Sequence, residues 1–166
     1  MNSSGNNKYK YDEKEQSALR LLEDIAEGKR TFAEVFGISI EEMYSVAQAG
    51  FNLLVSGNRD EAEIIFEGLV TINPRDPYFR TILGSIYLKK GYFEQAIAEY
   101  SMALETCSQD TETIANRGEA RFLSGHFSEA LHDLENALNN HSALDTKRKE
   151  YLEKLLLQAR KKTQPS

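Results

Sequence analysis

The sequence is short of cysteine, and it has no long apolar run and no tryptophan. Its single cysteine, Cys107, cannot form an internal disulfide and favours a reducing compartment. No apolar run approaches the roughly 20 residues that a membrane-spanning helix needs. The N-terminal residues are polar and lack the apolar core of a signal peptide. We therefore expect a cytoplasmic protein without direct membrane insertion.

Residue types that carry chemistry are also scarce. The three histidines are His126, His132 and His141. Their spacing completes no metal site with cysteine or carboxylate, so we expect surface histidines. Cys107 has no suitably spaced histidine that would make it a nucleophile, and no glycine-rich phosphate loop is present. The sequence thus predicts a protein that is not an enzyme, with no catalytic residue, no metal and no cofactor.

Basic side chains are too few over most of the chain to attract nucleic acid. Residues 43–144 carry 7 basic and 14 acidic side chains, whereas residues 145–166 carry 7 basic and 3 acidic ones. An acidic body argues against a nucleic-acid partner, which would require a basic face. The basic C-terminus is either a contact patch or, as we favour, the complement of the C-terminal dipole of a final helix.

What the sequence does contain is a repeat of 34 residues between Met43 and Leu144. Small and large residues recur at this period: Gly50, Gly84 and Gly118; Gly57, Gly91 and Gly125; Ala62, Ala96 and Ala130; Phe66, Tyr100 and Leu134. This period is typical of helix–turn–helix repeats that stack on one another. The sequence predicts an all-α solenoid of three repeats, residues 43–76, 77–110 and 111–144. Within each repeat, small residues let the two helices approach, and a glycine in the turn is expected to need a positive φ.

Segments outside the repeats are expected to flank this solenoid. Residues 1–11 are predicted to be a disordered tail, and residues 12–42 a helical segment that begins with an amphipathic helix. The apolar stripe of that helix covers either the first repeat or a second copy of the protein. Residues 145–166 form a capping helix and tail, for which Ser142 and Asp145 are candidate N-caps.

The 34-residue pattern resembles the tetratricopeptide-repeat family. The stretch from Thr31 to Ser39, then Glu41-Glu42-Met43-Tyr44 and the segment from Gly57 to Leu69, is similar to the class II chaperones of bacterial type III secretion. These chaperones hold hydrophobic translocator proteins before export. The resemblance covers roughly residues 31–138 and departs at Phe66–Val70, where the family is more aromatic.

The resemblance implies a bacterial cytoplasmic chaperone whose partners are translocator proteins. It also implies a homodimer formed through the N-terminal helix, with Leu21, Leu22 and Ile25 at the interface.

In such a stack the first helix of each repeat lines a concave groove, and the second, fifth, ninth, twelfth and thirteenth positions point into it. These positions are Tyr44, Ala47, Phe51, Leu54 and Val55 in the first repeat, Tyr78, Thr81, Ser85, Leu88 and Lys89 in the second, and Glu112, Ala115, Glu119, Phe122 and Leu123 in the third. The groove begins apolar and aromatic, which suits an extended peptide with apolar side chains. The alternative is that Tyr44, Phe51 and Leu54 pack under the N-terminal helix and never meet a ligand.

Other functions of tetratricopeptide domains can be compared at the same positions. Domains that hold the C-terminal carboxylate of heat-shock chaperones use Lys, Asn and Arg. This sequence has Ala47, Phe51, Ile82, Glu112 and Asn116 there. Such a set cannot hold a carboxylate. We expect a secretion chaperone, with a generic scaffold in a larger assembly as the alternative and an enzyme accessory domain as a third.

Overall fold

The structure is a computed structural model, and it describes residues 12–140 and 144–164. The predicted disordered tail, Ser142 and His141 lie outside the described residues. Within the described ranges the chain forms nine α-helices and no β-strand. None of these helices combines the length and the apolar character that crossing a bilayer requires. The helices belong to two compact units, and the chain passes from the first unit to the second between residues 39 and 40.

The first unit contains helices α1 (Glu13–Ala26) and α2 (Phe32–Phe36). Both begin with a reciprocal cap, in which an N-cap side chain and a glutamate three residues later bond each other's backbone. In α1 these partners are Asp12 and Glu15, each bond 2.8 Å long. None of the described residues of α1 is buried, so its apolar stripe lies on the surface of this unit.

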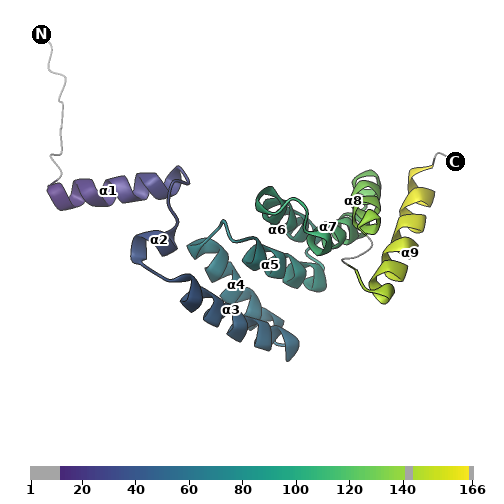
Figure 1. Ribbon diagram of the computed structural model, residues 1–166, viewed down its shortest axis with the longest axis horizontal. Helices are drawn as coiled ribbons and strands as arrows, with labels where there is room; N and C mark the ends of the chain where they lie inside the picture. The colour runs from purple at the N-terminus through teal and green to yellow at the C-terminus, as the bar shows by residue number, and fades with distance from the viewer. Residues whose placement is uncertain (1–11, 141–143, 165–166) are drawn as a thin grey trace, which may run out of the picture. The chain divides into compact units, whose positions relative to one another are not determined.

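The second unit is a stack of helical hairpins followed by a single helix (Figure 1). The hairpins are α3 (Ile40–Val55) with α4 (Arg59–Ile72), α5 (Pro77–Lys90) with α6 (Phe93–Thr106), and α7 (Thr111–Leu123) with α8 (Phe127–Asn139), and the last helix is α9 (Thr146–Thr163). The two helices of each hairpin pack on each other, the second helix of a hairpin packs on the first helix of the next, and α9 packs on α8 and α7. The predicted solenoid of three helix–turn–helix repeats with a terminal helix is confirmed.

Aspartates begin the first helix of successive repeats. Asp76 accepts a hydrogen bond from the Tyr78 amide at 2.9 Å, and Asp110 accepts one from the Thr113 amide at 3.3 Å. Asp145, one of the two candidate caps, does the same for α9. These side chains satisfy backbone N–H groups that the first helical turn leaves without partners.

The turn glycines have the conformation that their recurrence predicts. Gly57, Gly91 and Gly125 have φ values of +94°, +82° and +88°. Side chains rarely tolerate this left-handed region, and glycine ends each first helix there so that the second can fold back.

The small residues on facing helices allow the hairpins to close. A Cβ atom on Gly84 would lie 2.8 Å from Cε1 of Tyr100, whose side chain is fully buried. The alanines of the repeat ladder, Ala62, Ala96 and Ala130, have no exposed surface. The expected packing role of these residues is therefore confirmed, because a larger residue would have to displace an aromatic ring in a dense core.

Two glycine substitutions separate packing from helix propensity. We expect Gly84→Ala to destabilise the protein by about 1–3 kcal/mol, because the new methyl group overlaps the Tyr100 ring. Gly68 lies in α4 with open space around its Cα. Gly68→Ala is expected to stabilise the protein by about 0.5–1 kcal/mol through helix propensity alone. Urea denaturation of both variants measures the difference, and equal effects would contradict this explanation.

Candidate functional site

The first helices of the repeats form a continuous surface, which we call the A-helix face (α3, α5 and α7). Tyr44 of α3 stacks on Tyr78 of α5 with ring centroids 5.6 Å apart. Thr81 of α5 and Thr113 of α7 share a hydroxyl–hydroxyl hydrogen bond of 2.9 Å. These direct contacts hold α3, α5 and α7 side by side.

Most of the predicted groove residues reach the surface of this face. Those exposed are Tyr44, Phe51, Val55, Tyr78, Lys89, Glu112 and Leu123, and those half-buried are Leu54, Thr81, Ser85, Leu88, Glu119 and Phe122. Ala47 and Ala115 are buried at 1% and 0% exposure, so the structure places them in the core. The fifth position of the repeat lies where neighbouring helices touch, and it sets their spacing.

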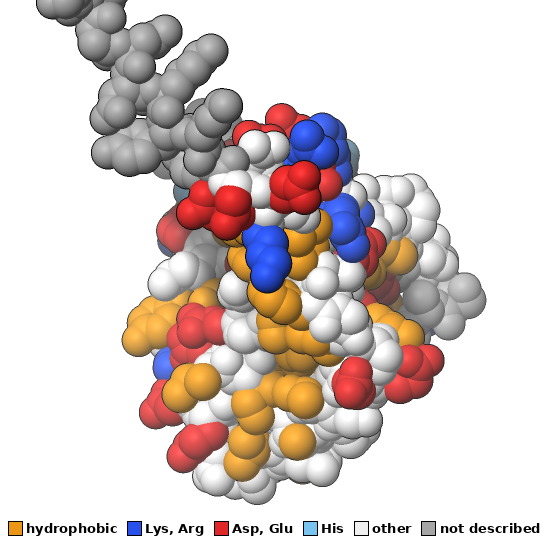
Figure 2. Space-filling view, turned by 90° about the vertical axis from the view of Figure 1, so that its left-hand side faces the viewer, with side chains coloured by type: hydrophobic (Ala, Val, Ile, Leu, Met, Phe, Trp, Pro, Cys, Tyr) orange, Lys and Arg blue, Asp and Glu red, His pale blue; other side chains and the backbone are white. Residues whose placement is uncertain are grey.

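The exposed part of the face is apolar at its start. Tyr44, Phe51 and Val55 of α3 are all exposed, as is Tyr78 of α5. In the space-filling view of Figure 2, hydrophobic side chains are exposed among polar and acidic ones. Large apolar side chains that lie exposed next to one another commonly mark a binding surface.

Aromatic rings join α3 to α5. Besides stacking on Tyr78, Tyr44 lies 5.3 Å from the Phe79 ring, which is fully buried. The Tyr44 hydroxyl donates to Asp76 Oδ2 at 3.2 Å. Partial burial and the negative charge of Asp76 raise the pKa of Tyr44, so its hydroxyl stays protonated and keeps donating at neutral pH. The aromatic cluster is thus a fixed surface that pays little conformational entropy when a ligand binds.

A small pocket opens beside this cluster, and we call it the α5 pocket. It has a volume of about 210 Å³ and is lined by Pro77, Tyr78, Thr81, Cys107 and Asp110. Most of its lining surface is apolar, and the Asp110 carboxylate is also bonded to Thr113. Sequence reasoning found Tyr78 and Thr81 but missed Cys107 and Asp110, which follow α6 and lie outside the periodic helix positions.

At the third repeat, side chains of α9 cover the acidic positions. Arg148 donates to Glu119 Oε2 at 2.8 Å, and its Nε lies 3.8 Å from Glu112 Oε2. The Tyr151 hydroxyl donates to Glu119 Oε1 at 2.8 Å. Burial, followed by the bond to Glu119, raises the pKa of Tyr151 to about 12. Neither Arg148 nor Tyr151 was among the sequence-predicted site residues.

Sequence comparison matches part of this architecture directly. The tetratricopeptide-repeat profile matches residues 79–110, which comprise most of α5, all of α6 and the loop after it. The fold is the tetratricopeptide fold. No curated protein is significantly similar in sequence to the chain.

Solved structures with the tetratricopeptide fold extend the comparison. A type III secretion complex from Aeromonas hydrophila is 21% identical, with a TM-score of 0.76, and the match covers 86% of this chain and 97% of that one. The chaperone SycD of Yersinia enterocolitica, in complex with a peptide of the translocator YopD, is 22% identical, with a TM-score of 0.67 over 76% of this chain and 98% of that one. The tetratricopeptide domain of Arabidopsis OM64 is 19% identical, with a TM-score of 0.64 over 71% and 96%. The predicted resemblance to secretion chaperones is confirmed at the level of the fold.

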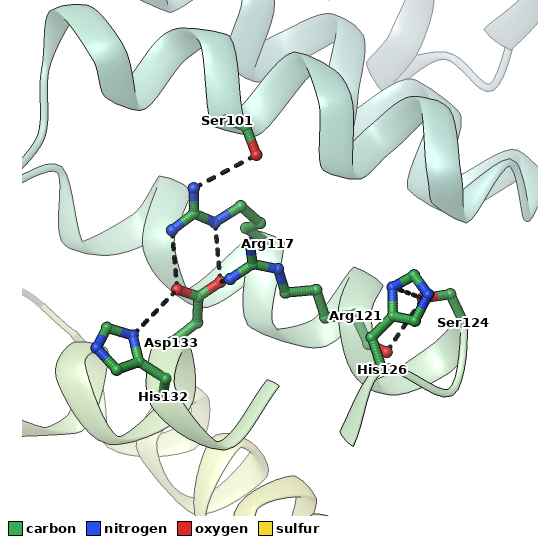
Figure 3. A network of polar contacts seen from close by, with 7 residues as sticks. All are labelled: Ser101, Arg117, Arg121, Ser124, His126, His132 and Asp133. Atoms are coloured by element: carbon green, nitrogen blue, oxygen red, sulfur yellow. Dashed lines mark hydrogen bonds and ion pairs between the residues drawn. The ribbon is translucent and has the colours of Figure 1, made fainter. Parts of the chain in front are cut away.

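The third tetratricopeptide repeat also contains a buried ionic network. Figure 3 shows Arg117 and Arg121 of α7 converging on the carboxylate of Asp133 in α8. Asp133 is 1% exposed. Its carboxylate accepts hydrogen bonds from Arg117 Nε at 2.8 Å, from Arg117 Nη2 at 2.9 Å and from Arg121 Nη1 at 2.6 Å. Each carboxylate oxygen has a charged donor, so this network holds α7 on α8 and leaves no unpaired oxygen for a ligand.

The histidines near this network do not complete a metal site. His132 and His126 are both exposed. Among the described residues, no group of three or more His, Cys, Asp or Glu side chains is placed to hold a metal ion.

Removing Asp133 tests the structural role of the network. We expect Asp133→Ala to destabilise the protein by about 3 kcal/mol, because two largely buried arginines lose their shared counter-ion. Glu129 is exposed on the same helix, and Glu129→Ala should change stability by less than about 0.5 kcal/mol. Guanidinium denaturation compares them, and a stable Asp133→Ala protein would contradict the assigned role.

Proposed function

We propose that the chain is a cytoplasmic chaperone of bacterial type III secretion that binds a hydrophobic translocator segment on its A-helix face. One observation carries the proposal: large apolar side chains of α3 and α5 lie exposed together on a surface held rigid by the repeats. Binding there would remove apolar surface of the partner from water. Aggregation and premature self-association of the partner would then decrease.

The geometry suits an extended segment of partner chain. The aromatic cluster offers flat apolar surface, and the α5 pocket has room for one apolar side chain. Thr81 and Asp110 line that pocket and can bond the backbone of an extended peptide. A similar fold in the SycD complex carries a translocator peptide, which supports the same class of ligand for this chain.

A generic scaffold remains the second candidate function. It is favoured by the similarity to the tetratricopeptide domain of OM64, whose TM-score of 0.64 is close to that of SycD. A scaffold would bind a folded subunit and would show no preference for an unstructured apolar peptide. The chemistry of the bound partner therefore separates the two functions.

Homodimerisation through α1 is part of the proposed chaperone. Leu22 is exposed, and Leu21 and Ile25 are half-buried, so the stripe offers an apolar surface to a second copy. Leu22→Glu should raise the dimer dissociation constant more than tenfold, because a carboxylate would then be buried at the interface. Light scattering across a concentration series measures the mass, and a monomeric unaltered chain would contradict this part of the proposal.

A pair of exposed apolar residues tests which face binds the client. Phe51 lies on the A-helix face with 38% exposure, whereas Ile64 lies on α4 with 69% exposure. Phe51→Ala should weaken binding of an unstructured translocator peptide by about 1–3 kcal/mol, because a buried aromatic anchor is lost. Tyr78→Ala should act in the same direction. Ile64→Ala removes a comparable apolar side chain away from this face and should leave binding unchanged.

Calorimetry on folded variants gives the comparison. Equal binding by the Phe51→Ala and Ile64→Ala proteins would contradict binding on the A-helix face. Capture of only folded, soluble partners in a co-expression experiment would favour the scaffold.

A further inference from the structure

The ninth position of the repeat changes its chemistry along the A-helix face. It holds Phe51, Ser85 and Glu119 in turn, so the side chain changes from aromatic to hydroxyl to carboxylate. The carboxylate nevertheless has only 15% of its side chain exposed. Its neighbour Glu112, at the second position of the repeat, is half exposed at 51%.

In the second repeat, the polar side chain at the ninth position, Ser85, has a hydrogen-bond partner in the same repeat. There the buried Tyr100 donates its hydroxyl to Ser85 at 3.1 Å. The third repeat has Leu134 in place of that tyrosine and has no hydroxyl to offer. Glu119 therefore takes its partners from outside the repeats, namely Arg148 and Tyr151 of α9.

Arg148 of α9 lies next to the carboxylates of both Glu112 and Glu119. Its Nη2 atom donates to Asn116 Oδ1 at 2.5 Å, while Nη1 bonds Glu119 and Nε lies near Glu112. Its guanidinium also lies 5.5 Å from the ring centre of Tyr151. One cation thus faces two anions, and its three nitrogens all have partners on α7.

We propose that Arg148 is a specificity-determining residue of the A-helix face, which selects apolar segments with neutral flanks by cancelling the charge of Glu119. This inference rests on the proposed function. It means that the A-helix face gains no affinity from basic residues beside the apolar segment. Without Arg148, Glu112 and Glu119 would present two negative charges in an acidic repeat body and would attract lysine or arginine beside the apolar segment.

Arg148→Met tests the inference, because methionine keeps an unbranched apolar stem and removes the charge. The probes are two synthetic peptides with the same apolar sequence, one flanked by lysine at both ends and one by glutamine. The unaltered protein should bind them within about twofold of each other. Arg148→Met should favour the lysine peptide by about fivefold at low salt, the size of one Coulomb contact in water. Added salt at 0.5 M should remove most of the preference.

Arg160 offers a matched control on the same helix. It pairs with Glu135 at 2.8 Å, and both side chains are about half exposed. Arg160→Met therefore removes one ion pair of α9 without changing the A-helix face. This variant should bind both peptides like the unaltered protein.

A second variant covers the case in which Arg148→Met does not fold. Glu119→Gln leaves Arg148 in place and removes one carboxylate, so it should shift the preference toward the glutamine peptide. Peptide selectivity that is unchanged in the folded variants, or that shifts equally in Arg160→Met, would overturn the inference. If the unaltered protein binds neither peptide, the proposed function itself fails, and the inference falls with it. That outcome is read from the unaltered protein and is distinguishable from the others.

Discussion

The close approach of two helices within each hairpin is the constraint on which the rest of the structure depends. Gly84 brings α5 against the Tyr100 ring of α6, and Gly50 and Gly118 occupy the same place in the neighbouring repeats. Each tightly packed helix pair then packs with the same geometry against the next hairpin. Residues 34 positions apart in the sequence are therefore displaced by the same rotation and translation from one repeat to the next. The A-helix face exists because equivalent positions are repeated by that displacement.

Within this constraint, the repeats carry different residues at two equivalent positions. The first repeat has Phe51 and Phe66 there, and the second has Ser85 and Tyr100, whose hydroxyls are hydrogen-bonded. The third repeat has Glu119 and Leu134, and Glu119 takes its polar partners from α9. The terminal helix therefore covers the end of the stack and also neutralises a charge that the last repeat cannot satisfy alone.

Periodicity in the sequence is sufficient to predict the helices, the turns and most of the surface positions of the repeats. Each depends on local spacing, as at Gly91, whose positive φ follows from its place between two helices. Arg148 and Cys107 could not be found in this way, because they reach the A-helix face from elements outside the periodic positions. Ala47 is placed in the groove by its position in the repeat, but contact between helices buries it. Periodicity therefore does not tell which of these positions are covered by a neighbouring helix. The groove assignment as a ligand site stays a prediction.

Cys107 provides a direct test of the central claim that an apolar segment binds along α3 and α5. It is exposed, lines the α5 pocket and is the single cysteine of the chain, so its alkylation reports on that pocket alone. The measurement is the rate of thiol alkylation with and without a saturating apolar peptide from a translocator. Binding on the A-helix face predicts a rate reduced severalfold, with restoration when Phe51 is replaced by alanine and the peptide dissociates. An unchanged rate at saturation would place the peptide elsewhere and contradict the account.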